Sequence, residues 1–317
     1  MSIFRNISRT MLLLTLIGLV FSGCTAASRA GKQSLTLGQD EEKTEQKGND
    51  SALRLARLLC AQGRYQGALS IYGRLDQRGV LTPLELLEYA NVTSLVSPPK
   101  DTLSLFLRAE KALTETKKEL APEKTCELHT GLGRARMAVG QFEKAIENFD
   151  IALEAVPEHI AALNAKGVLL DAKGDHARAR ELLSKANELA PTDVRILNNL
   201  ALSYLSGGYD KEAIQYFNQA QSLEDSPSIQ LNQAFTYFMS DNTEKTLSSL
   251  QEFMPRQQAN TFMDMFGKMR ERIQAEESTI SEELLRAAGK LIEINPPVKR
   301  GRTVSTFSPE TTAPLKS

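Results

Sequence analysis

The chain has 317 residues, with 38 lysine and arginine residues against 39 aspartate and glutamate residues, so its formal net charge at pH 7 is −1. This balance argues against a nucleic-acid-binding protein, which would carry a basic face or stripe. Hydrophobic residues make up 41% of the chain. That content is ordinary for a globular protein, and a chain of this length can bury a core without disulfides or metals.

The first 23 residues have the pattern of a secretory signal peptide. Arg5 and Arg9 precede an apolar run from Met11 to Phe21. The run has ~11 residues, whereas a helix that spans a bilayer needs ~20. A basic start, a short apolar stretch and small residues before a cleavage site define a signal peptide. We therefore expect residues 1–23 to direct export.

The end of this segment, Val20-Phe21-Ser22-Gly23-Cys24, resembles the lipobox of bacterial lipoproteins. Phe21 stands where that family usually has leucine or valine. The resemblance implies that Cys24 is lipidated, becomes the new N-terminus and anchors the chain to a membrane outside the cytoplasm, where more than one acyl chain is needed for stable attachment. The alternative is an ordinary signal peptide that ends near a cysteine.

Two polar segments flank the apolar part of the chain. Residues 24–50 are rich in Ser, Gln, Lys, Glu and Gly and show no apolar period, so we expect a flexible tether. Residues 295–317 contain Pro296-Pro297 followed by a Thr, Ser, Pro and Lys-rich stretch, and we expect this tail to be disordered.

The segment between them repeats every 34 residues, most clearly over 126–258. Small residues recur at Gly133, Gly167 and Ala201, where a first helix would meet the second helix of its pair closely. The facing positions on the second helices are also small, at Ala145, Ala179 and Ala213. Four residues later each second helix has a large residue, Phe149, Leu183 or Phe217, and glycines recur in the turns at Gly140, Gly174 and Gly208. Periods of 20–50 residues predict stacked supersecondary units.

These positions resemble those of the tetratricopeptide repeat family. The resemblance implies an all-α, right-handed superhelical solenoid. Divergent units fit residues 51–116, and a degenerate sixth unit, with Asp241-Asn242 in place of its turn glycine, completes the array. We therefore expect about six helix pairs, with atypical terminal units.

Residues 259–294 keep helical spacing after the repeat ends. Phe262, Phe266 and Met269 share one face, and Thr279 with Glu282 predicts a capping box for a last helix. We expect these helices to cap the open apolar end of the stack. Because methionine-rich faces adapt to partners, a docking surface is the alternative.

No motif in the sequence indicates catalysis. Gly131-Leu132-Gly133 belongs to the repeat rather than to a phosphate-binding loop, and Cys60 and Cys126 lack the spacing of metal ligands. The three histidines, His129, His159 and His176, have no partners arranged as in a known catalytic triad. We expect a protein that is not an enzyme, with no cofactor, no metal and no small-molecule substrate.

The concave side of such a solenoid is its usual binding surface. The family resemblance assigns groove positions on the first helices, and asparagine amides there can pair with a peptide backbone while apolar residues receive side chains. These candidate protein-binding residues are Arg134, Asn164, Asp171, Arg195, Asn198, Asn199, Leu202, Leu205, Asn232, Phe235 and Phe238. For Phe235 and Phe238, packing beneath the C-terminal helices is an equal alternative.

The stretches Ala190–Tyr204 and Gly207–Ile214 look like the TadD lipoproteins of tight-adherence (Flp) pilus systems. This resemblance implies a non-catalytic assembly factor at the outer membrane, facing the periplasm, that binds a secretin or other pilus and secretion proteins. Thr25 after the cysteine agrees with outer-membrane sorting. The alternative is a lipoprotein adaptor for another envelope client, such as a type IVa pilus pilotin or a peptidoglycan-hydrolase adaptor.

Overall fold

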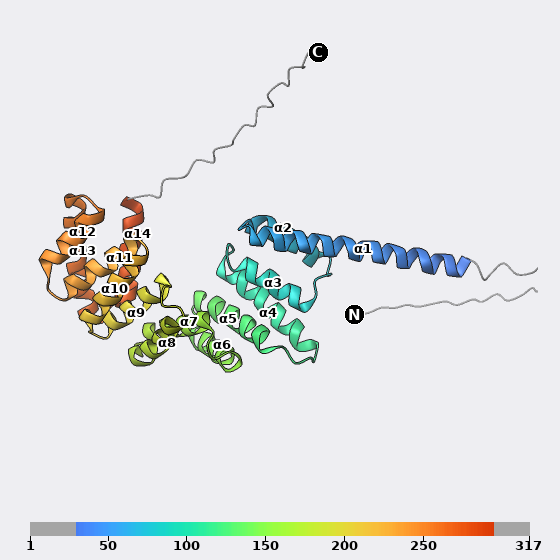
Figure 1. The fold of residues 1–317 in the computed structure, drawn as a ribbon, viewed down its shortest axis with the longest axis horizontal. Helices are drawn as coiled ribbons and strands as arrows, with labels where there is room; N and C mark the ends of the chain where they lie inside the picture. The colour runs from blue at the N-terminus through green and yellow to red at the C-terminus, as the bar shows by residue number, and fades with distance from the viewer. Residues whose placement is uncertain (1–29, 295–317) are drawn as a thin grey trace, which may run out of the picture. The chain divides into compact units, whose positions relative to one another are not determined.

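The computed structural model describes residues 30–294, which form fourteen α-helices (Figure 1). The expected signal peptide, the lipidation site Cys24 and the expected tail at 295–317 lie outside these residues. The chain divides after Val80 into two units. No helix of the described part is long and apolar enough to cross a membrane.

The first unit contains α1 (Ala30–Ala61) and α2 (Tyr65–Gln77), which form a helix pair. Its core consists of buried side chains from both helices, namely Leu53, Ala56, Ala68, Ile71, Tyr72 and Leu75. Gly63 turns the chain between the two helices with φ of +71°, a conformation that glycine adopts without a steric penalty.

Residues 30–50 are helical, which corrects the prediction of a flexible tether over this stretch. The segment has no proline, and a polar composition does not prevent a helix from extending out of a buried one, since extension is easier than nucleation. Arg78, just beyond α2, also holds this stretch. Its guanidinium donates to Asn49 Oδ1 at 2.9 Å and pairs with Glu45, so α1 is supported before its apolar face begins.

The second unit contains five further helix pairs and two C-terminal helices. The pairs are α3 (Pro83–Thr93) with α4 (Pro99–Glu115), α5 (Pro122–Ala138) with α6 (Phe142–Ala155), α7 (Ile160–Ala172) with α8 (His176–Leu189), α9 (Val194–Ser206) with α10 (Asp210–Leu223), and α11 (Pro227–Met239) with α12 (Thr243–Phe253). The last helices are α13 (Arg256–Gln274) and α14 (Ile280–Ile294). The predicted all-α fold of about six pairs with C-terminal helices is confirmed.

Helix starts follow local chemistry. Proline occupies the first turn of α3, α4, α5 and α11, where its missing N–H is not needed. Thr82 and Glu85 form a capping box for α3, and Thr279 and Glu282 form the predicted one for α14, with bonds of 3.0 and 3.2 Å. The repeat block begins at Pro122 rather than at residue 126 because this proline starts the helix.

Glycines at two kinds of position allow the pairs to form. Gly140, Gly174 and Gly208 have φ of 79°, 83° and 78° in the turns, as predicted. Asp241 replaces the glycine of the next turn and also has positive φ, 55°. A Cβ on Gly133 would lie 2.5 Å from the ring of Phe149, so only glycine allows these helices to approach so closely.

We expect Gly133→Ala to lower the free energy of unfolding by ~1–2 kcal/mol, because the clash with the fully buried Phe149 outweighs the helix propensity gained. Urea denaturation at constant m-value measures the change. Gly267→Ala in α13 is the matched control. Its Cβ would meet nothing within 4 Å, so the same substitution there should be neutral or stabilising. Equal effects at both sites would contradict the packing role.

Candidate protein-binding groove

The first helices of successive pairs lie next to one another along one side of the second unit. Contacts join α3 to α5, α5 to α7, α7 to α9 and α9 to α11, and successive second helices make fewer contacts. This side is therefore the inner, concave one. The helices α5, α7 and α9 that contain most of the predicted groove residues are all part of it.

Three pockets follow this side of the unit, and we call them together the groove. Their volumes are about 520 Å³ between α3 and α5, about 720 Å³ between α5, α7 and α9, and about 290 Å³ between α9 and α11. The first two share Arg134 and His159, and the last two share Arg195 and Asn199. The groove is therefore continuous rather than a set of separate sites.

Asparagine pairs link the first helices across the groove. Asn199 Nδ2 donates to Asn164 Oδ1 at 3.0 Å, and Asn232 Nδ2 donates to Asn198 Oδ1 at 2.9 Å. Each pair uses one donor and one acceptor of two amides, and each amide offers more sites than that. The remaining donors and acceptors suit a peptide backbone. The four predicted asparagines are thus brought together in two pairs.

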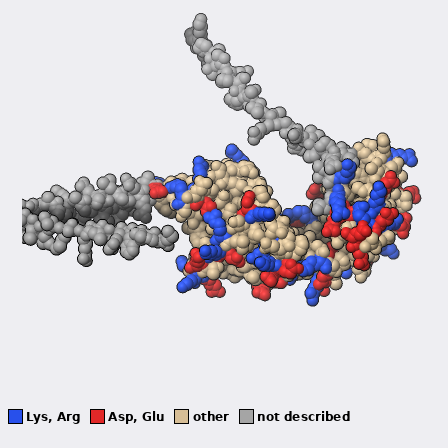
Figure 2. Space-filling model, turned by 180° about the vertical axis from the view of Figure 1, so that it is seen from behind, with Lys and Arg blue, Asp and Glu red and all other residues tan. Residues whose placement is uncertain are grey.

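The charges of the groove are mixed. Arg134 is exposed and lines the first two pockets. Arg195 binds Asp193 at 2.7 Å, and its hydrogen bond lowers the pKa of the Asp193 carboxyl. Glu127 accepts from Asn91 and Lys124. Figure 2 likewise shows lysine and arginine interspersed with aspartate and glutamate over the face in view, so this face offers no single-sign patch.

Two residues that line the groove, Thr102 and His159, were not among the predicted groove residues. Thr102 on α4 is 4% exposed and lines the first pocket, and its hydroxyl has no hydrogen-bond partner in the described residues. His159 begins α7 as its N-cap, with Nδ1 accepting from the Ala162 N–H at 3.3 Å, and it lies 3.3 Å from Thr130 Oγ1. The family pattern assigns groove positions within the first helices, whereas Thr102 is on a second helix and His159 is a helix cap, so neither was predicted as a groove residue.

Asp171 was predicted to lie in the groove, but it lies outside it. It is 8% exposed, accepts from the Ser203 hydroxyl at 2.6 Å and lies 2.8 Å from His176 Nδ1. These bonds join α7 to α8 and α9. The Asp171 carboxylate is therefore part of the interface between two helix pairs, where it helps to hold α9 against α7.

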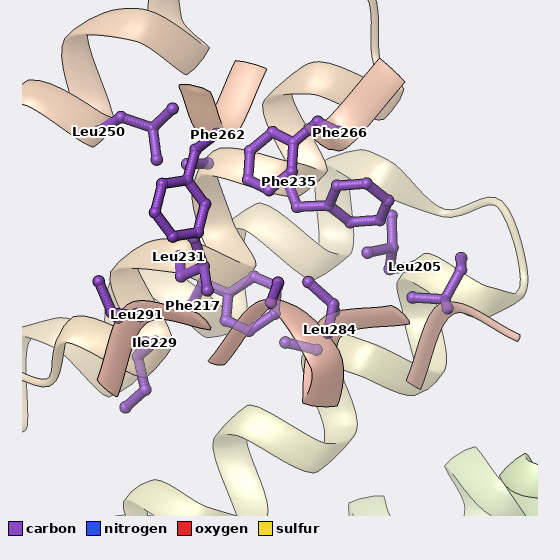
Figure 3. Close-up of a cluster of buried hydrophobic side chains, with 14 of the residues drawn as sticks. Leu205, Phe217, Ile229, Leu231, Phe235, Leu250, Phe262, Phe266, Leu284 and Leu291 are labelled. Carbon is purple, nitrogen blue, oxygen red and sulfur yellow. The ribbon is translucent and has the colours of Figure 1, made fainter. Parts of the chain in front are cut away.

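The apolar residues predicted for the groove are covered by the chain itself. Leu205 is 3% exposed and Phe235 is fully buried, and Leu202 packs against the same cluster. Phe235 packs edge-to-face on Phe266 of α13 and Phe238 packs on the same ring at a tilt, with ring centres 5.1 and 5.6 Å away. The alternative that both phenylalanines pack beneath the C-terminal helices is the one the structure shows. Figure 3 shows Leu205, Phe235, Phe266 and Leu284 in one cluster.

The C-terminal methionines also belong to this cluster rather than to an open surface. Met254 and Met269 are 5% and 1% exposed, and Met263 and Met265 pack against the cluster. This burial favours the capping interpretation of α13 over the docking alternative. Elsewhere, burial raises the pKa of the Cys126 thiol, and a buried thiol of raised pKa is a poor nucleophile. No group in the described residues has the composition of a metal site.

Comparison with known proteins agrees with this architecture. Residues 130–194 and 194–227 match family profiles of the tetratricopeptide repeat. The structure of a tetratricopeptide repeat protein from Parabacteroides merdae is similar over 78% of this chain and 99% of that chain, with a TM-score of 0.54 and 16% identity. The fold is therefore that of a tetratricopeptide-repeat solenoid, a class of proteins that bind other proteins.

Two curated relatives are similar over shorter stretches. The uncharacterized protein y4yS of Sinorhizobium fredii is 31% identical over 33% of this chain and 62% of its own length. The peroxisomal targeting signal receptor of Eremothecium gossypii is 27% identical over 52% of this chain and 26% of its own length. The chain thus matches only part of each relative.

The lowered pKa values of two histidines lead to a prediction of how the free energy of unfolding changes with pH. Burial lowers the pKa of His159 and of His129, and Nδ1 of each lies within hydrogen-bonding distance of a neighbouring group. Their folded-state pKa lies below the unfolded value of 6.5, so the unfolded chain binds more protons as pH falls. Their contribution is complete above pH ~6.5 and is lost below it.

We therefore expect the free energy of unfolding to decrease from pH 7 to pH 5, with a slope of at most ~1.4 kcal/mol per pH unit for each histidine. Urea titrations at several pH values measure this slope. His159→Asn replaces the Nδ1 acceptor at the N-cap by an amide oxygen that does not titrate, and it should reduce the slope. An unchanged slope in His159→Asn and in His129→Gln would contradict the assignment.

Proposed function

We propose that this chain is an outer-membrane lipoprotein that acts as a scaffold for assembly of a Tad (Flp) pilus or its secretin. The observation that supports the binding role best is the continuous groove on α5, α7 and α9, with its two asparagine pairs. The lipobox-like residues before Cys24 and the TadD-like stretch around Asn198 support the location and the system.

The groove suits an extended segment of a partner protein. Amides on successive first helices occur at intervals of one repeat, so a peptide backbone laid along the groove would meet donors and acceptors repeatedly. One relative is named a targeting signal receptor, which supports peptide recognition by repeats of this kind.

Membrane anchoring would strengthen such binding. A lipid on Cys24 would confine the groove to the membrane face and raise its effective concentration beside other membrane proteins. Because α1 is helical from Ala30, we infer that the length of this helix contributes to the distance between a lipid on Cys24 and the repeats. No bond is made or broken in this mechanism.

Charge reversal in the groove tests the binding role. We expect Arg134→Glu combined with Asn199→Ala to lower co-purification of the Tad secretin roughly tenfold, as loss of central contacts does in protein interfaces. Arg178→Glu is the matched control, because Arg178 is exposed on α8 and lines none of the three pockets. Equal co-purification with both variants would contradict recognition through the groove.

Cell fractionation tests the anchor. Cys24→Ser removes the sulfur that would be lipidated, so we expect the protein to move from the outer-membrane fraction to the soluble periplasmic fraction. Immunoblotting of the separated fractions measures this, with Cys60→Ser as the control that leaves Cys24 in place. A Cys24→Ser protein that stays with the membrane would show that this residue does not anchor it.

Deletion of the gene tests the system. If the chain assembles a Tad pilus, the clean deletion should lose surface pili and secretin multimers while secretin monomers remain. Wild-type piliation would contradict the proposal, and co-purification of a cell-wall enzyme in place of secretion components would favour the adaptor alternative.

A further inference from the structure

The last helix, α14, lies against the first helices of the second unit, next to the third pocket. It contacts α9 and α11, which are the first helices of two successive pairs. Its buried apolar residues, among those whose side chains are described, are Ile280, Leu284, Ala287 and Leu291. Their spacing of four, three and four residues places them on one stripe of the helix. An amphipathic helix in an apolar groove is a common mode of partner recognition.

The surface beneath α14 contains residues that the repeat pattern assigns to a bound partner. Leu205 of α9 is in the same buried cluster as Leu284 and Leu291, and Phe235 of α11, in that cluster, packs on Phe266 of α13. Figure 3 shows Leu284 and Leu291 in the same cluster as Leu205 and Ile229. Since Leu205 is on α9 and Ile229 is on α11, α14 covers parts of both first helices.

A polar contact holds the first turn of α14. The Glu283 carboxylate is fully buried and accepts from Arg272 Nε and Nη2 at 2.8 and 2.6 Å, from Ser278 Oγ at 2.6 Å and from Arg286. The hydrogen bond from Arg272 is the main reason why the pKa of Glu283 falls to about 2. This contact gives α14 a defined register on α13.

α14 is also joined to the fold in a way that permits release. Residues 275–279 connect it to α13, and Glu276 there has φ of +59°. The five helix pairs of the unit and α13 pack on one another through contacts that do not involve α14. Its departure would expose the apolar surface of α9 and α11 and leave those pairs assembled.

We propose that this surface is a docking site for an amphipathic helix of a partner protein, and that α14 occupies it in cis until the partner displaces it. The matching partner helix has apolar residues spaced as in α14 and a carboxylate that binds Arg272. This inference rests on the proposed function, since it adds a helix-binding section to the open groove. When α14 occupies the site, the apparent Kd for the partner equals the intrinsic Kd divided by the fraction of molecules in which the site is open.

A synthetic α14 peptide tests the site without knowledge of the natural partner. A fluorescein-labelled peptide of residues 276–294 is titrated with the full chain, and its anisotropy is measured. The variant Leu284→Asp with Leu291→Asp weakens α14 in cis and leaves α9 and α11 unchanged. We expect this variant to bind the peptide at least roughly tenfold more tightly than the wild-type chain does.

Two controls define specificity. Arg178→Glu changes an exposed charge on α8, away from α14, and should bind the peptide as weakly as the wild type. A peptide with Leu284→Asp and Leu291→Asp should not bind the open variant. Failure of the open variant to bind the wild-type peptide, with its remaining helix content intact by circular dichroism, would overturn the proposal. The secretin experiment with Arg134→Glu is independent of this result.

Hydrogen exchange of the wild-type chain provides a second measurement that needs no variant. If α14 detaches as a unit, its amides exchange through local opening, and faster than those of α11. Added unlabelled partner-like peptide should accelerate exchange in α14 and leave α11 protected. Equal protection of α14 and α11 would show that α14 is a permanent part of the core and would overturn the proposal.

Discussion

The close approach of the two helices within each pair is the constraint on which the rest of the structure depends. At Gly133 and Gly167 the absence of a side chain makes room for Phe149 and Leu183, which are both fully buried. This contact recurs once per repeat, so each pair presents the same faces to its neighbours. The first helices therefore follow one another on the inner side, and the groove is a consequence of how the pairs pack.

The sequence predicted most of this core because a repeat reports the same packing position several times. Turn glycines, small residues and the C-terminal capping box were all assigned to their observed places. Residues 30–50 were different. Their polarity showed that they lack a core of their own. Composition carries no information on the contacts that Glu45 and Asn49 make with Arg78, because Arg78 lies about 30 residues further along the chain.

The candidate site was predicted less completely for a related physical reason. Periodicity identifies the helix face on which a residue lies, but it does not identify what covers that face. Asn164 and Asn199 lie in the open groove, whereas Leu205 and Phe235 lie on equivalent faces beneath the C-terminal helices. Asp171 shows the same limit for a polar residue, since the Ser203 hydroxyl that satisfies it comes from the next pair.

The two sections of the concave side differ in whether they can be exposed to water without a cost in free energy. Amides such as those of Asn164 and Asn199 remain hydrogen-bonded to each other and to solvent when no partner is present, so the open section is stable while empty. The section beneath α14 is apolar, and a large exposed apolar patch is rare in soluble domains because it promotes association. That section must therefore be covered at all times, by α14 or by a helix of similar pattern. An exchange of one cover for the other keeps the cluster around Leu205 and Phe235 buried throughout, which is the condition under which a groove of this composition can be used for binding.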